Sequence, residues 1–131
     1  MRQILSSKSI VVFWLAFSSP LLVGTPVAAD PAEEARRVNP AIFAAWQAMR
    51  QLDCARCHGR DYTGSVGGSL LEAARARSRE EFRRLVLEGN LARGMPPYSS
   101  VSLAAENIEG MYDYLRGRAD GTIPTGILIR E

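Results

Sequence analysis

Cys54-Ala55-Arg56-Cys57-His58 lies near the middle of a chain of 131 residues that contains two Cys and one His in all. This stretch therefore holds every thiol and every imidazole of the chain. One His cannot supply two imidazoles to a metal ion, and two Cys cannot build a dense disulfide scaffold. The chemistry of the protein is expected to be concentrated in this short segment.

The spacing C-x-x-C-H is the pattern of c-type haem attachment. In that chemistry each thiol adds to one haem vinyl group, and His58 lies under the iron as an axial ligand. Three alternatives stay open. A structural zinc site needs four ligands, a thioredoxin-like dithiol wants a preceding strand, and a plain disulfide leaves His58 without a role. One covalent haem c on Cys54, Cys57 and His58 accounts for all three residues.

The first 29 residues have the composition of an export signal. A basic start with Arg2 and Lys8 precedes an apolar run over residues 10–17, and Val-Ala-Ala at 27–29 offers the small residues that signal peptidase requires. We expect cleavage after Ala29 and a periplasmic location, which suits haem attachment outside the cytoplasm. An uncleaved anchor is the alternative, although the apolar run is short for a membrane-spanning helix.

The positive charge of the chain belongs to its leader. The formal net charge is +2, but without Arg2 and Lys8 the remaining chain has as many Arg as Asp plus Glu. Such a balance does not suggest a nucleic-acid-binding protein. The hydrophobic fraction of 47% and the charged fraction of 23% are those of a globular chain. A single small domain is therefore expected.

Apolar spacing predicts an all-α domain without strands. An Asn-Pro start at 39–40 predicts a helix over 40–53, and a capping box at 78–81 predicts a helix that ends at Gly89. Further helices are expected over 70–77 and from Ser102 to the glycines at 117 and 121, whereas 91–100 should be irregular. The expected organisation is a leader (1–29), a flexible segment (30–38), the main domain (39–118) and a C-terminal tail (119–131).

A methionine is expected as the second axial ligand, because the chain has no second His. Met49 lies on the helix that leads into Cys54 and cannot readily cross the haem, and Met111 lies on an apolar stripe that suits core packing. Met95 lies in Gly-Met-Pro-Pro, far enough from His58 to reach the opposite face and stiffened by proline. We expect Met95 to bind the iron; the alternative is a core methionine. A His/Met pair passes electrons, and Met raises the potential.

These residues resemble the class I c-type cytochromes, which are small monohaem electron carriers. The resemblance covers nearly all of residues 30–117, through the C-x-x-C-H motif, the Gly-Met-Pro-Pro-Tyr segment at 94–98 and the Tyr-Asp-Tyr-Leu ending at 112–115. It implies three to four helices wrapped on one covalently attached haem, with the first and last helices crossing and Phe43 and Trp46 packed on Tyr112 and Leu115. The stretch 114–121 also resembles cytochromes that accept electrons from periplasmic quinoprotein dehydrogenases.

One position departs from the family pattern. The family usually has Gly-Pro-x-Leu after the haem motif, and the proline carbonyl accepts a hydrogen bond from the proximal His. Residues 67–70 read Gly-Gly-Ser-Leu, so Gly68 takes the place of the proline and holds its carbonyl less firmly. Arg60, Arg75 and Arg93 are candidates to neutralise the haem propionates, since a buried carboxylate needs a partner; the alternative is that they are solvated.

The leading hypothesis is a periplasmic electron carrier rather than an enzyme. We expect a monomer with a dehydrogenase upstream and an oxidase or reductase downstream, docked near Cys54, Arg56 and the Met95 loop. No nucleic acid and no membrane anchor is expected. The alternatives are a haem subunit of a larger oxidoreductase complex, or a sensor or enzyme with an open iron if Met95 does not bind.

Overall fold

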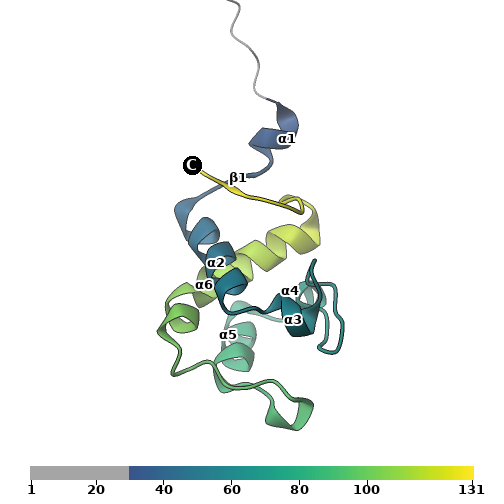
Figure 1. Cartoon of the computed structure of the whole chain (residues 1–131), viewed down its shortest axis with the longest axis vertical. Coiled ribbons are helices and arrows are strands. Elements are labelled where there is room, and N and C mark those ends of the chain that lie inside the picture. Colours follow the sequence, from purple (N-terminus) through teal and green to yellow (C-terminus); the bar gives the residue numbers. More distant parts are fainter. Residues whose placement is uncertain (1–29) are drawn as a thin grey trace, which may run out of the picture.

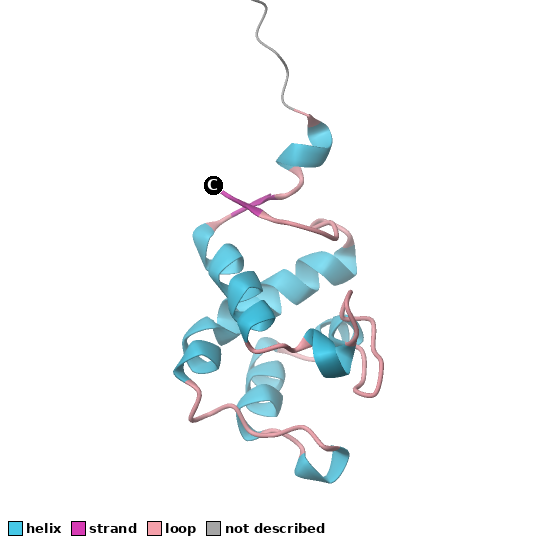
Figure 2. Ribbon diagram, viewed as in Figure 1, coloured by secondary structure: helices cyan, strands magenta, loops and turns pink. Residues whose placement is uncertain are grey.

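The structure is a computed structural model that describes residues 30–131. The expected leader, residues 1–29, lies outside the described residues. The elements in chain order are α1 (Pro31–Glu34), β1 (Arg37–Val38), α2 (Pro40–Gln51), α3 (Ala55–His58), α4 (Leu70–Ala76), α5 (Arg79–Glu88), the 3-10 turn η1 (Leu91–Arg93), α6 (Ser102–Asp120) and β2 (Ile129–Arg130). Figure 2 shows that helices dominate, so the all-α prediction is confirmed.

The crossing of α2 and α6 forms the centre of the fold (Figure 1). α2 begins as predicted, because the Asn39 side-chain oxygen accepts a hydrogen bond from Ile42 N at 3.0 Å. At the crossing, a Cβ on Gly110 would lie 2.6 Å from the carbonyl oxygen of Ala41. Glycine therefore lets the two backbones approach closely. The largest fully buried side chains also come from these two helices: Met49, Tyr114 and Leu115.

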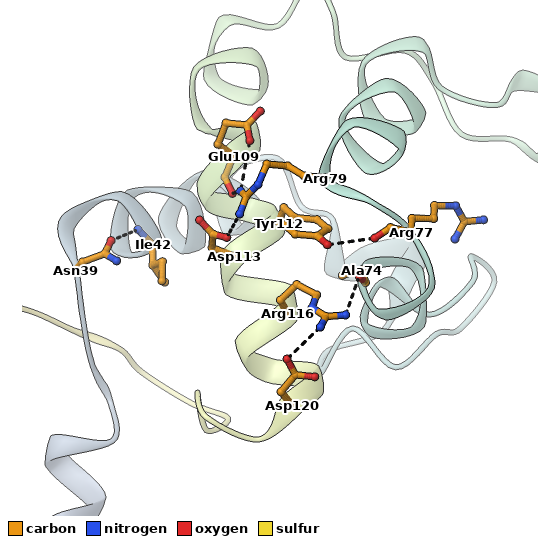
Figure 3. A network of polar contacts seen from close by, with 10 residues as sticks. All are labelled: Asn39, Ile42, Ala74, Arg77, Arg79, Glu109, Tyr112, Asp113, Arg116 and Asp120. Atoms are coloured by element: carbon orange, nitrogen blue, oxygen red, sulfur yellow. Dashed lines mark hydrogen bonds and ion pairs between the residues drawn. The ribbon is translucent and has the colours of Figure 1, made fainter.

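Polar contacts fix the corner between α4 and α5 on α6 (Figure 3). The Arg79 guanidinium lies 2.5 Å from Asp113 Oδ1 and 4.7 Å from the centre of the Tyr112 ring. The Tyr112 hydroxyl donates to the Arg77 carbonyl at 3.1 Å. Because exposed ion pairs contribute little to stability, these contacts mainly fix position. The buried Phe82 ring, 5.5 Å from that of Tyr112, supplies the apolar contact between α5 and α6.

The two ends of the described chain pair with each other, which corrects the prediction that strands are absent. β1 and β2 form a parallel pair in which Ile129 N donates to the Arg36 carbonyl at 2.8 Å. α1 and β1 also give regular structure to the segment expected to be loose. Strands of two residues are too short to show an alternating pattern in the sequence. β1 leads directly into α2, and β2 pairs with it at the same end of the molecule (Figure 1). Leu128, which precedes β2, is buried.

Of the two glycines predicted to end α6, Gly121 does so and Gly117 does not. Gly117 lies inside the helix, which continues to Asp120 and ends at Gly121 with φ 79°. A Cβ on Gly117 would lie 2.6 Å from Ile123 Cδ1, so this glycine makes room for the returning tail. Within residues 30–131, no helix has the length and apolar character needed to cross a membrane.

Candidate functional site

A single helical turn, α3, arranges the C-x-x-C-H motif. His58 N donates to the Cys54 carbonyl at 3.1 Å, so the thiols of Cys54 and Cys57 fall on one side of the turn. Cys54 is half-buried and Cys57 is exposed. Burial raises the pKa of the Cys54 thiol to about 11. Without an attached haem, this thiol therefore keeps its proton at neutral pH.

The loop after α3 fixes the orientation of the His58 ring. His58 Nδ1 donates a hydrogen bond to the Gly68 carbonyl at 2.6 Å. Since a carbonyl can only accept, Nδ1 carries the proton and the Nε2 lone pair is free for a metal ion. Gly67 lies against the same ring, because a Cβ on it would be 3.0 Å from both Nδ1 and Cε1 of His58. The acceptor expected at Gly68 is therefore in place without a proline.

Adding a methyl group should cost more stability at Gly67 than at Gly68. In Gly67→Ala the new Cβ meets the His58 ring and the Cys57 carbonyl at 3.1 Å, so we expect a loss of about 1–3 kcal/mol in the free energy of unfolding. In Gly68→Ala the new Cβ meets no protein atom within 4 Å and φ is not left-handed, so this variant lacks the clash with the ring and should lose less. Urea unfolding of the two haem-loaded variants measures both. Equal effects would contradict the role of Gly67 as the support of the ring.

A cavity of about 460 Å³ opens beside α3, and all four predicted haem-binding residues contribute to its lining. Cys54, Cys57, His58 and Met95 line it together. The rest of the wall is mainly apolar and includes Leu52, Leu70, Phe82, Leu85, Val86 and Ala104. Two thiols, an imidazole with a free Nε2, a thioether and apolar walls are the groups that a covalent haem requires. The residues present therefore fit this cofactor.

Backbone hydrogen bonds fix the Met95 loop, although its sequence predicts no regular structure. Asn90 N donates to the Met95 carbonyl at 2.8 Å, and Met95 N donates to the Asn90 carbonyl at 3.0 Å. The Asn90 side chain accepts from Arg93 N at 3.2 Å and thereby caps η1 inside the loop. Gly94 closes the turn with φ 78°. Both backbone polar groups of Met95 are thus fixed at the edge of the cavity.

All three methionines of the described chain line this cavity, which the sequence did not indicate. Met49 and Met111 are 2% and 4% exposed and belong to the hydrophobic core formed by the helices. Met95 is half-exposed and lies outside that core cluster. Of the three methionine side chains, Met95 is therefore the one that does not pack in the core between the helices.

The arginine candidates separate in space. Arg93 lines the cavity. Arg75 binds the Glu72 carboxylate at 2.7 Å and the Ala119 carbonyl, and the described structure places neither it nor Arg60 in the cavity lining. Arg77, which was not a candidate, lines the cavity because it follows the end of α4 in an extended conformation. In the sequence it is one of several Arg on a charged stretch, so no signal distinguished it.

Comparison with known proteins matches the region that contains the cavity. The model of the family described as "Cytochrome C oxidase, cbb3-type, subunit III" matches residues 41–115. Cytochrome c-555 of Methylococcus capsulatus is 36% identical over 92 residues, which are 70% of this chain and 73% of that protein. The crystal structure of the c-type cytochrome XoxG from Methylobacterium extorquens AM1 has a TM-score of 0.65 at 23% identity, which indicates a shared fold. That match covers 72% of this chain and 61% of the XoxG chain, so this chain spans less than two thirds of it.

Proposed function

This chain belongs to the cytochrome c family, and on that premise we propose that it carries single electrons between periplasmic redox proteins through a haem held by His58 and Met95. It is a small class I, monohaem c-type cytochrome, and its cofactor is one covalent haem c. Cys54 and Cys57 are the two thiols of the described chain and form the attachment pair. When bound, the haem supplies one-electron Fe(III)/Fe(II) chemistry.

The observation that carries the proposal is the convergence of two independently fixed ligands on one cavity. His58 comes from α3, where the Gly68 carbonyl sets its ring and tautomer. Met95 comes from the loop after α5, where Asn90 holds its backbone. Both side chains line the same cavity. If the imidazole and the thioether both bound the iron of a haem, no position would be left there for a substrate, which favours electron transfer over catalysis at the iron.

Docking is proposed at the rim of the cavity. Val66 lines the cavity with 88% of its surface exposed, and Leu91 in η1 is 75% exposed. Small exposed apolar contacts of this kind suit short-lived redox complexes. We propose a quinoprotein dehydrogenase as the donor and an oxidase or reductase as the acceptor. The supporting observation for the donor is the resemblance of residues 114–121 noted above.

Rates of electron transfer with a periplasmic quinoprotein dehydrogenase should depend weakly on salt. Asp53 offsets one of the two positive charges of Arg77 and Arg93 at the cavity, and residues 30–131 are formally neutral, so no strong field of one sign steers the partner. We expect the second-order rate to fall less than about tenfold between low salt and ~0.1 M, where screening is already substantial. Stopped-flow mixing at increasing ionic strength measures this. A fall by several orders of magnitude would reveal a charged docking patch.

A second candidate is a haem subunit of a larger oxidoreductase complex. The observation that favours it is the description of the matching family, which is that of an oxidase subunit. Sedimentation of the purified native protein separates the two candidates. A free monomer that still exchanges electrons supports the carrier, whereas purification in a stable complex with other chains supports the subunit.

A further inference from the structure

We propose that Gly89 is a positioning residue for Met95, because the absence of a side chain there lets the Pro96–Pro97 peptide lie directly on the end of α5. The inference rests on the proposed axial role of Met95. It assigns to a helix-ending glycine a role in holding the iron ligand on the following loop. The contact is between backbone atoms, so it fixes where the loop lies relative to α5.

The conformation and surroundings of Gly89 both require glycine. Its φ of 71° and ψ of −169° fall in a region that residues with a Cβ rarely adopt. A Cβ at this position would lie 2.6 Å from the Pro96 carbonyl carbon and 2.6 Å from Pro97 N. These are backbone atoms, so a clash could not be relieved by rotation of a side chain. Any side chain on Gly89 must displace the Pro96–Pro97 peptide.

Hydrogen bonds flank this contact but do not reach it. On one side the Asn90 and Met95 backbones are paired at 2.8 and 3.0 Å. On the other side Tyr98 N and Ser99 N each donate to the Leu87 carbonyl at 3.1 Å. Pro96 and Pro97 have no N–H to donate. Between the two sets of hydrogen bonds, the surface of Gly89 therefore determines how close the loop lies to α5.

Displacement of this peptide acts on Met95 more than on the fold. Pro96 is bonded directly to Met95, so a shift of the peptide moves the thioether relative to the cavity. The buried anchor of α5, Phe82, lies two helical turns earlier and packs on Tyr112. The helix can therefore stay in place while the loop moves. An axial bond tolerates little movement of its ligand, which makes the iron the sensitive reporter.

The test compares haem-loaded Gly89→Ala with wild type, Met95→Ala and Gly121→Ala. Gly121 ends α6 with φ 79° and an added Cβ there meets no atom within 4 Å, so this variant carries backbone strain without the clash. The readouts are the ferric absorption band of methionine-bound haem and the affinity for added imidazole, which competes with Met95. Gly89→Ala should lose the band and bind imidazole at least about tenfold more tightly, because a displaced loop competes less. Gly121→Ala should match wild type.

Each outcome decides one claim. If Gly89→Ala keeps the band and the imidazole affinity of wild type while Met95→Ala does not, the positioning role is wrong and the Met95 assignment stands. If Met95→Ala itself matches wild type, the proposed function has failed instead. Should Gly89→Ala yield no folded haem protein, Pro96→Gly keeps the contacting backbone atoms but removes the fixed φ of proline, so the same peptide is free to move off Gly89 without strain at Gly89 itself. That variant should also bind imidazole more tightly, and wild-type affinity there would overturn the inference.

Discussion

Replacing both Cys54 and Cys57 with Ala is expected to abolish covalent haem and to leave most of the chain unfolded. The two thioethers need both sulfur atoms, and Cys54 and Cys57 are the free thiols of the described chain. Without haem, the apolar walls of a cavity of about 460 Å³ lose the group they enclose. A domain of this size buries a modest core, and a haem enclosed by these walls would add to the apolar surface that folding removes from water. A haem stain after denaturing electrophoresis and circular dichroism measure the two effects.

A matched control for this variant lies inside the motif. Arg56 is exposed and sits between the two thiols, so Arg56→Ala leaves both sulfur atoms and the His58 orientation in place. Its haem stain and helical signal should equal those of wild type. Covalent haem that survives the double cysteine change would contradict the attachment chemistry.

Met95→Ala should remove the absorption band of methionine-bound ferric haem and lower the midpoint potential. A thioether stabilises Fe(II) relative to Fe(III), so its loss favours the oxidised iron. The expected fall is on the order of 0.1 V, within the range of roughly 0.8 V over which axial ligands set haem potentials. The overall fold should persist, because Met95 lies outside the hydrophobic core. Optical titration against redox mediators measures the potential.

Met111→Ala is the control for that result, since Met111 lines the same cavity. Its side chain is 4% exposed in the core, so truncation should keep the band and cost about 2–5 kcal/mol in the free energy of unfolding. If the band were lost in Met111→Ala or in Met49→Ala but retained in Met95→Ala, the Met95 assignment would be wrong. The ligand would then be one of the two helical methionines.

Features that depend on neighbouring residues could be predicted from the sequence. The start of α2 follows from Asn39 and Pro40, and the start of α5 follows from a capping box in which Ser78 and Glu81 bond reciprocally. The motif at 54–58 specifies its own chemistry, because both thiols and the imidazole lie on one turn of chain. The hydrogen bond from His58 to Gly68 is also local, but it was expected from the family resemblance.

Features that depend on distant segments could not be predicted. Gly117 looks like a helix end in the sequence, but in the fold it leaves room for the side chain of Ile123, which packs back against α6. The β1–β2 pair joins the two ends of the described chain through strands of two residues each. Arg77 faces the cavity and Arg75 does not, because α4 ends between them. The contact of Gly89 with the Pro96–Pro97 peptide likewise appears only when the loop folds back on α5.

The central claim is that one haem c with His58 and Met95 as axial ligands carries single electrons. An optical redox titration of the purified wild-type protein tests it most directly. We predict a ferric spectrum with the methionine charge-transfer band, which disappears in one reversible one-electron step as the haem is reduced. A ferric spectrum of high-spin haem without that band would show an open iron and contradict the account.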